Sequence, residues 1–259
     1  MNILFIGDII GNPGRRAVAA LLPELRREIS LDFIIANGEN SAGGVGITKP
    51  VFDELRSYGI DVVTTGNHIW DKREIIPSME TETRLLRPAN YPPGTPGRGW
   101  ERYACGSLTI GVVNLAGRVY MPPVDCPFRQ ADLIMADLSD CDLIFVDFHA
   151  EATSEKIALA WHLAGRATAV IGTHTHVQTA DERILPGGTA YMTDAGMVGA
   201  RDSVLGVKSE AVLRKFLTGM PTRFEVADGL VSFNAVLLEF DLQRKTISGI
   251  KRVNREVNT

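Results

Sequence analysis

The chain contains five short strand-like runs that each end in a polar side chain able to bind a metal ion. The runs cover residues 3–6, 33–36, 61–65, 143–148 and 169–171. Short apolar runs of this kind are typical of strands that are buried on both faces of a mostly parallel sheet. The polar residues at or just beyond their ends are Asp8, Glu39, Asn67, His149 and His174. Because ligand sites in open α/β sheets collect outside the carboxyl ends of the strands, we expect these five side chains to share one site.

The segments between and after these runs predict the rest of the fold. Helices are predicted at residues 15–29, from 48, at 129–138, from 154 and at 208–217, with Gly11–Gly14 as a loop. Pro23 is expected to kink or split the first helix. Hairpins are predicted at 103–110 and 182–193, and C-terminal strands at 223–226, 230–240 and 247–253. This order favours an α/β fold of two packed mixed sheets with helices outside, in one domain spanning residues 1–259.

Composition excludes several classes of partner and compartment. The chain has 27 basic and 31 acidic residues, a net charge of −4 and no basic run, so non-specific binding to a nucleic-acid backbone is not expected. The N-terminus lacks a basic segment, and no window reaches the roughly 18 apolar residues of a membrane span. Three cysteines without a CxxC pair argue against a disulfide framework. We therefore expect a cytoplasmic protein without membrane contact, with a homo-oligomer as the default assembly.

Histidine placement predicts that the shared site binds metal. The chain has only five histidines, and two of them, His174 and His176, lie in the hexapeptide Ile171–His176 directly after an apolar run. The full set of candidate ligands comprises two carboxylates, two amides and three imidazoles: Asp8, Glu39, Asn40, Asn67, His149, His174 and His176. Seven donors are too many for one tetrahedral zinc, and imidazoles do not suit an all-oxygen calcium site.

The mixture of nitrogen and oxygen donors instead suits two divalent ions such as Mn, Fe or Zn, about 3.5–4 Å apart. A carboxylate is the natural bridge between two such ions, and Glu39 is the predicted one. Such a pair favours attack of a bridging hydroxide on a phosphoryl group. His68 follows Asn67 and is the predicted general acid, because imidazole exchanges protons near neutral pH. The alternative for His68 is a further ligand or a group that supports one.

The same residues resemble a known family. Gly7-Asp8, Gly38-Glu39-Asn40, Gly66-Asn67-His68, His149 and Gly172–His176 resemble the five ordered sequence blocks of the calcineurin-like metallophosphoesterases. Two positions depart from that pattern. Ile10 stands where the first block usually has a histidine, and Glu39 stands where the second usually has an aspartate. These departures, with Glu39–Gly44 and Phe148–Lys156, resemble the bacterial YmdB-like subfamily.

The resemblance implies a four-layer α/β/β/α sandwich, a dinuclear metal site and phosphodiesterase activity on small substrates such as 2′,3′-cyclic nucleotides. It implies a first metal held by Asp8, Glu39, Asn40 and His176. A second metal would be held by Glu39, Asn67, His149 and His174. With Ile10 at the usual histidine position, Asn40 or water is expected to complete the shell of the first metal.

Further residues and two other functions follow from the same pattern. The glycine-rich loop Ser41–Gly46 is expected to lie over the metals, and Arg118 and Arg201 are candidate phosphate clamps. A dinuclear site also suits a phosphomonoesterase. The third alternative is a metal-binding regulatory protein with vestigial catalysis, which the departure at Ile10 favours and the presence of His68 opposes.

Overall fold

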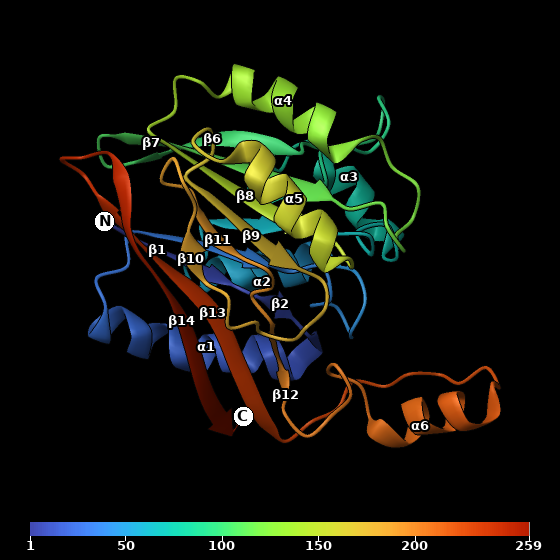
Figure 1. Ribbon diagram of the computed structural model, residues 1–259. Helices are drawn as coiled ribbons and strands as arrows, with labels where there is room; N and C mark the ends of the chain where they lie inside the picture. The colour runs from blue at the N-terminus through green and yellow to red at the C-terminus, as the bar shows by residue number, and fades with distance from the viewer. Residues whose placement is uncertain (259) are drawn as a thin grey trace.

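The computed structural model describes residues 1–258 and contains two β-sheets packed face to face between helices (Figure 1). The first sheet has the order β2-β12-β13-β1-β3-β4-β5, with β14 paired to β13. Its strands are β1 Asn2–Ile6, β2 Asp8–Ile9, β3 Phe33–Asn37, β4 Val62–Thr64, β5 Leu85–Leu86, β12 Met197–Ala200, β13 Leu230–Asp241 and β14 Thr246–Asn258. Strands β1, β3, β4 and β5 run parallel, and β13 is antiparallel to both β1 and β14.

The second sheet has the order β10-β11-β9-β8-β7-β6. Its strands are β6 Trp100–Cys105, β7 Leu108–Ala116, β8 Leu143–His149, β9 Ala169–Thr173, β10 Arg183–Ile184 and β11 Ala190–Met192. The helices are α1 Gly11–Glu28, α2 Lys49–Ser57, η1 Arg73–Ile75, α3 Ile76–Met79, α4 Pro127–Asp137, α5 Thr153–Leu163 and α6 Ser209–Thr218. Helix α6 projects from one end of the sandwich (Figure 1).

Three apolar cores hold these layers together. The core between the sheets includes Phe5 of β1 and Phe145 of β8, whose ring centroids lie 4.8 Å apart. A second core includes Leu22 of α1 and Leu55 of α2 against the first sheet, and a third includes Leu159 of α5 against the second sheet. The predicted sandwich of two mixed sheets flanked by helices is therefore confirmed.

The prediction of a loop at Gly11–Gly14 was wrong, and so was that of a helix split at Pro23. Gly11–Gly14 forms the first turn of α1 rather than a loop, because a proline there blocks no helical hydrogen bond. Pro23 does not split the helix, which continues to Glu28. The pyrrolidine ring of Pro23 lies on the exposed side of α1.

Towards the C-terminus, both predicted hairpins form, as β6–β7 and β10–β11. The predicted strand at 223–226 does not form, and the segment makes one isolated bridge, between Val226 and Val207. The sequence pattern also missed β12, where the chain passes from the second sheet to the first just after Asp194. Within residues 1–258, no helix has the length and apolar character needed to span a bilayer.

Candidate metal centre

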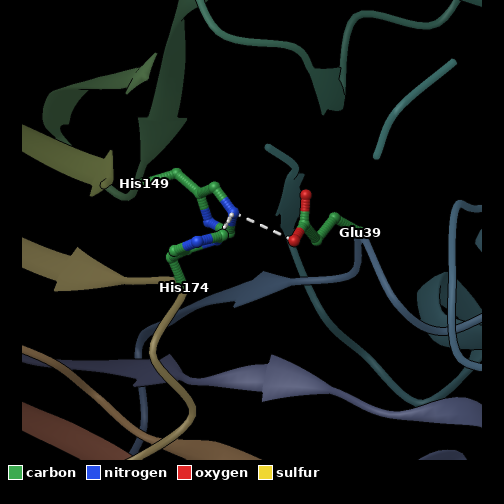
Figure 2. A group of neighbouring side chains, drawn as sticks. All are labelled: Glu39, His149 and His174. Atoms are coloured by element: carbon green, nitrogen blue, oxygen red, sulfur yellow. Dashed lines mark hydrogen bonds and ion pairs between the residues drawn. The ribbon is translucent and has the colours of Figure 1, made fainter. Parts of the chain in front are cut away.

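The predicted ligands meet where the carboxyl ends of strands from both sheets face each other. Figure 2 shows Glu39, His149 and His174 pointing toward one another. His149 Nε2 lies 2.9 Å from Glu39 Oε1, 3.0 Å from His174 Nδ1 and 3.2 Å from Asn67 Oδ1. One ring nitrogen cannot satisfy three polar neighbours at once, so this arrangement fits a cation shared among all four groups.

The remaining predicted ligands adjoin this group. Asp8 Oδ1 lies 3.9 Å from ring nitrogens of both His149 and His176. Asn40 Nδ2 lies 3.3 Å from His176 Nε2 and 3.1 Å from Glu39 Oε1, and a 180° turn of the amide would present Oδ1 instead. Asp8 Oδ1 is fully buried without a hydrogen-bond partner. A buried acceptor without a partner is costly, and a divalent cation would satisfy it.

The electrostatics of the two carboxylates differ. Burial raises the pKa of Asp8 to about 6. Burial also opposes ionisation of Glu39, but the adjacent His149 outweighs it and lowers the pKa of Glu39 to about 2. In the protein without metal, Glu39 is therefore an anion at neutral pH, which its predicted role as a bridging ligand requires.

Each imidazole also has an acceptor for its outer nitrogen. His149 Nδ1 lies 2.9 Å from Thr173 Oγ1, and His174 Nε2 lies 3.2 Å from Glu151 Oε2. His176 Nδ1 lies 3.0 Å from the backbone oxygen of Leu205. Metal-ligating histidines usually donate their second N–H in this way, which leaves the other nitrogen free to bind. The donor set of this structure therefore fits divalent metal ions.

The loop that carries two of the histidines has a strained backbone. His174 and His176 have φ angles of 100° and 65°, which are unfavourable for residues other than glycine. Asp194 holds the residue between them, because its Oδ2 accepts hydrogen bonds from Thr175 N at 3.1 Å and Thr175 Oγ1 at 2.8 Å. Lys156 of α5 donates to the same oxygen at 2.7 Å, and both side chains of this ion pair are buried.

A glycine beside Asn67 gives the ligands room. A Cβ added to Gly66 would lie 2.2 Å from His149 Cδ2 and 2.4 Å from Glu39 Oε2. Glycine is therefore required at position 66, because the two sheets approach each other closely at the site.

A cavity of about 310 Å³ opens onto these residues. Its polar lining includes Glu39, Asn40, His68, Glu151, His174 and His176. Its apolar lining consists of Ile10, Val45, Leu205, Val207 and Val226. A larger cavity of about 440 Å³ lies beside α4 and contains none of the predicted site residues.

His68 lies at the edge of the metal centre. Its backbone nitrogen donates to Glu39 Oε2 at 3.1 Å, and its Nδ1 lies 2.7 Å from Asp71 Oδ2. The side chain is 37% exposed and lines the cavity, whereas Asn67, the residue before it, points to His149.

Other predictions near the site had mixed outcomes. The loop Ser41–Gly46 does contribute to the cavity, through Gly44 and Val45. Arg201 is instead paired with Glu256 on β14, and Arg118 is not among the residues that line the cavity. Ile10 is buried and adds an apolar side chain to the cavity rather than a ligand.

Sequence reasoning missed three residues that support the predicted ones: Asp71, Glu151 and Thr173. Asp71 lies three residues after His68 and Glu151 two residues after His149, so both were close in sequence to predicted site residues. Asp194 belongs to the segment Thr193–Gly196, which follows a predicted strand and was a candidate for lining the site; the structure places its side chain against Thr175 of the histidine loop.

Comparison with known proteins agrees with the fold. A family model described as "YmdB-like protein" matches residues 4–253. A Bacillus subtilis (strain 168) protein named 2′,3′-cyclic-nucleotide 2′-phosphodiesterase is 48% identical over 254 residues, which cover 98% of this chain and 96% of that one. The crystal structure of a hypothetical protein from Thermus thermophilus superimposes with a TM-score of 0.94 at 45% identity and covers 99% of both chains. That of a novel phosphatase from Mycoplasma pneumoniae has a TM-score of 0.94 at 33% identity, covering 99% of this chain and 93% of the other.

The two-sheet sandwich and these relatives define the chain as a metallophosphoesterase, as its sequence blocks predicted. Within that class it belongs to the YmdB-like family.

The buried ion pair generates a prediction about stability. Lys156→Met leaves Asp194 as an unpaired buried charge, so we expect it to lower the free energy of unfolding by about 3–5 kcal/mol. Adding Asp194→Asn removes the second charge and should restore much of the loss. Urea unfolding of the metal-free protein measures both. Lys208→Met, which breaks an exposed pair with Glu225, is the control and should hardly move the urea midpoint. A double variant no more stable than Lys156→Met would contradict this account.

Proposed function

We propose that this protein is a metal-dependent phosphodiesterase that hydrolyses small phosphodiesters, with 2′,3′-cyclic nucleotides as the substrate class. The observation that carries the proposal is the cluster of Glu39, His149 and His174, whose ligand atoms all lie within 4.8 Å of one another beside an open cavity. The name of the Bacillus subtilis relative supports the substrate class.

The proposed ligands divide into two sets that share Glu39. Asp8, Glu39, Asn40 and His176 would hold one divalent ion, and Glu39, Asn67, His149 and His174 would hold the other. The contacts within each set support this division, since Asn40 adjoins His176 and Asn67 adjoins His149. Mn, Fe and Zn all accept such nitrogen and oxygen donors. Two ions of this kind supply a hydroxide nucleophile at neutral pH and neutralise charge on the phosphoryl oxygens.

His68 is proposed to protonate the leaving oxygen. Its contact with Asp71 fixes the ring and occupies Nδ1, so Nε2 is the nitrogen that can exchange a proton with the substrate. The hydrogen bond from its backbone to Glu39 keeps the acid at a constant distance from the bridging ligand. Protonation at this position makes an alkoxide into a better leaving group.

The apolar lining of the cavity is proposed to contact the nucleoside part of the substrate. When the phosphate lies at the donors, the rest of a cyclic nucleotide has to lie along the cavity, against residues such as Leu205 and Val226. Both residues come from the segments that flank α6, and Leu205 also binds His176 through its backbone. A lining of apolar side chains suits the flat face of a nucleobase.

The first test is turnover of 2′,3′-cyclic AMP by metal-stripped protein with added Mn²⁺. We expect Glu39→Gln to abolish it, because the shared carboxylate is lost. His68→Ala should lower kcat by about 10²–10⁴-fold while the bound metal is retained. His162→Ala is the control, since His162 is paired with Asp132 outside the cavity, and it should match the parent protein. Full activity in the His68 variant would remove its role as an acid.

Comparing bis(p-nitrophenyl) phosphate with p-nitrophenyl phosphate separates a diesterase from a monoesterase, since both release the same product. We expect the larger kcat/KM for the diester. Two metals bound per chain without turnover of any of these compounds would favour the regulatory alternative.

The apolar lining predicts a change in KM rather than kcat. Leu205→Ser should raise the KM for 2′,3′-cyclic AMP roughly tenfold, as loss of about 1.4 kcal/mol of binding would do. It should leave the KM for ethylene phosphate, a cyclic diester without a nucleoside, unchanged. Leu213→Ser on α6 makes the same substitution at an exposed position outside the cavity and serves as the control. Equal effects on both substrates would contradict a nucleoside contact.

A further inference from the structure

A buried hydroxyl links the metal-facing histidine of β8 to a carboxylate two residues earlier on the same strand. Thr173 Oγ1, on β9, lies 2.9 Å from His149 Nδ1 and 2.6 Å from Asp147 Oδ1. All three side chains are fully buried. Asp147 belongs to none of the ligand sets above and does not line the cavity. Its burial among polar neighbours therefore needs a separate explanation.

The direction of these hydrogen bonds depends on which ring nitrogen of His149 faces the other predicted metal ligands. His149 Nε2 is the nitrogen directed at Glu39, Asn67 and His174, so a metal held there takes the lone pair of Nε2. The ring proton then lies on Nδ1 and is donated to Thr173 Oγ1. The single hydrogen of that hydroxyl is free to bind the Asp147 carboxylate.

The other side of Asp147 is held by the first sheet. Its Oδ2 accepts from Thr64 Oγ1 of β4 at 2.5 Å and from Asn37 Nδ2 of β3 at 3.0 Å. Asn37 Nδ2 is also 3.4 Å from His149 Nδ1, but the Thr173 contact is much shorter. The carboxylate thus has fixed partners in both sheets and cannot turn away from Thr173.

We propose that Asp147 and Thr173 are positioning residues, and that the Asp147 carboxylate acts through the Thr173 hydroxyl to hold His149 with Nδ1 protonated and Nε2 aimed at the metal. The inference rests on the proposed metal site. The inference concerns affinity for the metal, which is measured without any substrate. It can therefore be refuted independently of the proposed hydrolysis.

A purely structural role of the same network is the competing explanation, and the chain offers a matched control. Thr64 and Thr173 are both buried threonines at a strand end, and both donate to Asp147. Only Thr173 contacts His149. Replacing either threonine by valine removes one hydrogen bond to the same carboxylate without changing the volume of the side chain.

The test compares Mn²⁺ affinity, by competition with a chelator, in Thr173→Val, Thr173→Ser and Thr64→Val, with urea unfolding of each metal-free variant. We expect Thr173→Val to weaken Mn²⁺ binding by about 10–100-fold, as is typical for loss of such an outer partner. Thr173→Ser, which keeps the hydroxyl, should restore affinity to within about threefold, by the same reasoning. Thr64→Val should lose stability comparably to Thr173→Val yet keep its affinity.

Equal loss of affinity in the two valine variants, or none in Thr173→Val, would overturn the proposal. A second measurement needs no variant: ¹⁵N NMR of the zinc-loaded parent protein reports which nitrogen of His149 carries the proton. A proton on Nδ1 supports the proposal, and a metal on Nδ1 refutes it. If the parent protein bound no metal at all, the metal site itself would be refuted.

Discussion

The site depends on the packing of the two sheets against each other at the ends of their strands. Asp8, Glu39 and Asn67 come after the strands β1, β3 and β4 of the first sheet, whereas His149 ends β8 and the histidine loop follows β9 in the second. Neither sheet holds a complete set of donors. The approach is close enough that a single methyl group at Gly66 would collide with groups from both sides. The apolar core between the sheets, which includes Phe5 and Phe145, therefore positions the donors as much as the local loops do.

Much of this arrangement was predictable because it follows from local patterns. Apolar runs ending in glycine and a polar residue predict both the buried strands and the edge where their side chains meet. Gly11–Gly14 was misassigned because glycine and proline usually indicate a loop, while here they begin a helix. Strand β12 was missed because it is short, and its pairing with β13 is a long-range contact that no local pattern encodes.

The supporting residues were harder to predict than the ligands, for a related reason. Thr173 and Asp194 act through partners that are distant in sequence, such as Asp147 and Lys156, and nothing in a threonine or an aspartate alone indicates such a partner. Ile10 illustrates the opposite case. Its departure from the family pattern was evident in the sequence, but only the structure shows that the side chain lines the cavity beside the predicted ligands.

The division of the donors between two sheets has a consequence for the lifetime of the protein in a cell. An ion that binds the folded chain and not the unfolded one stabilises the folded state by mass action. Because the ion would join the two halves of the sandwich, it would act as a removable cross-link, and separation of the sheets would require its release. Resistance to proteolysis would then rise and fall with the supply of divalent metal, so metal starvation would remove the protein as well as its activity.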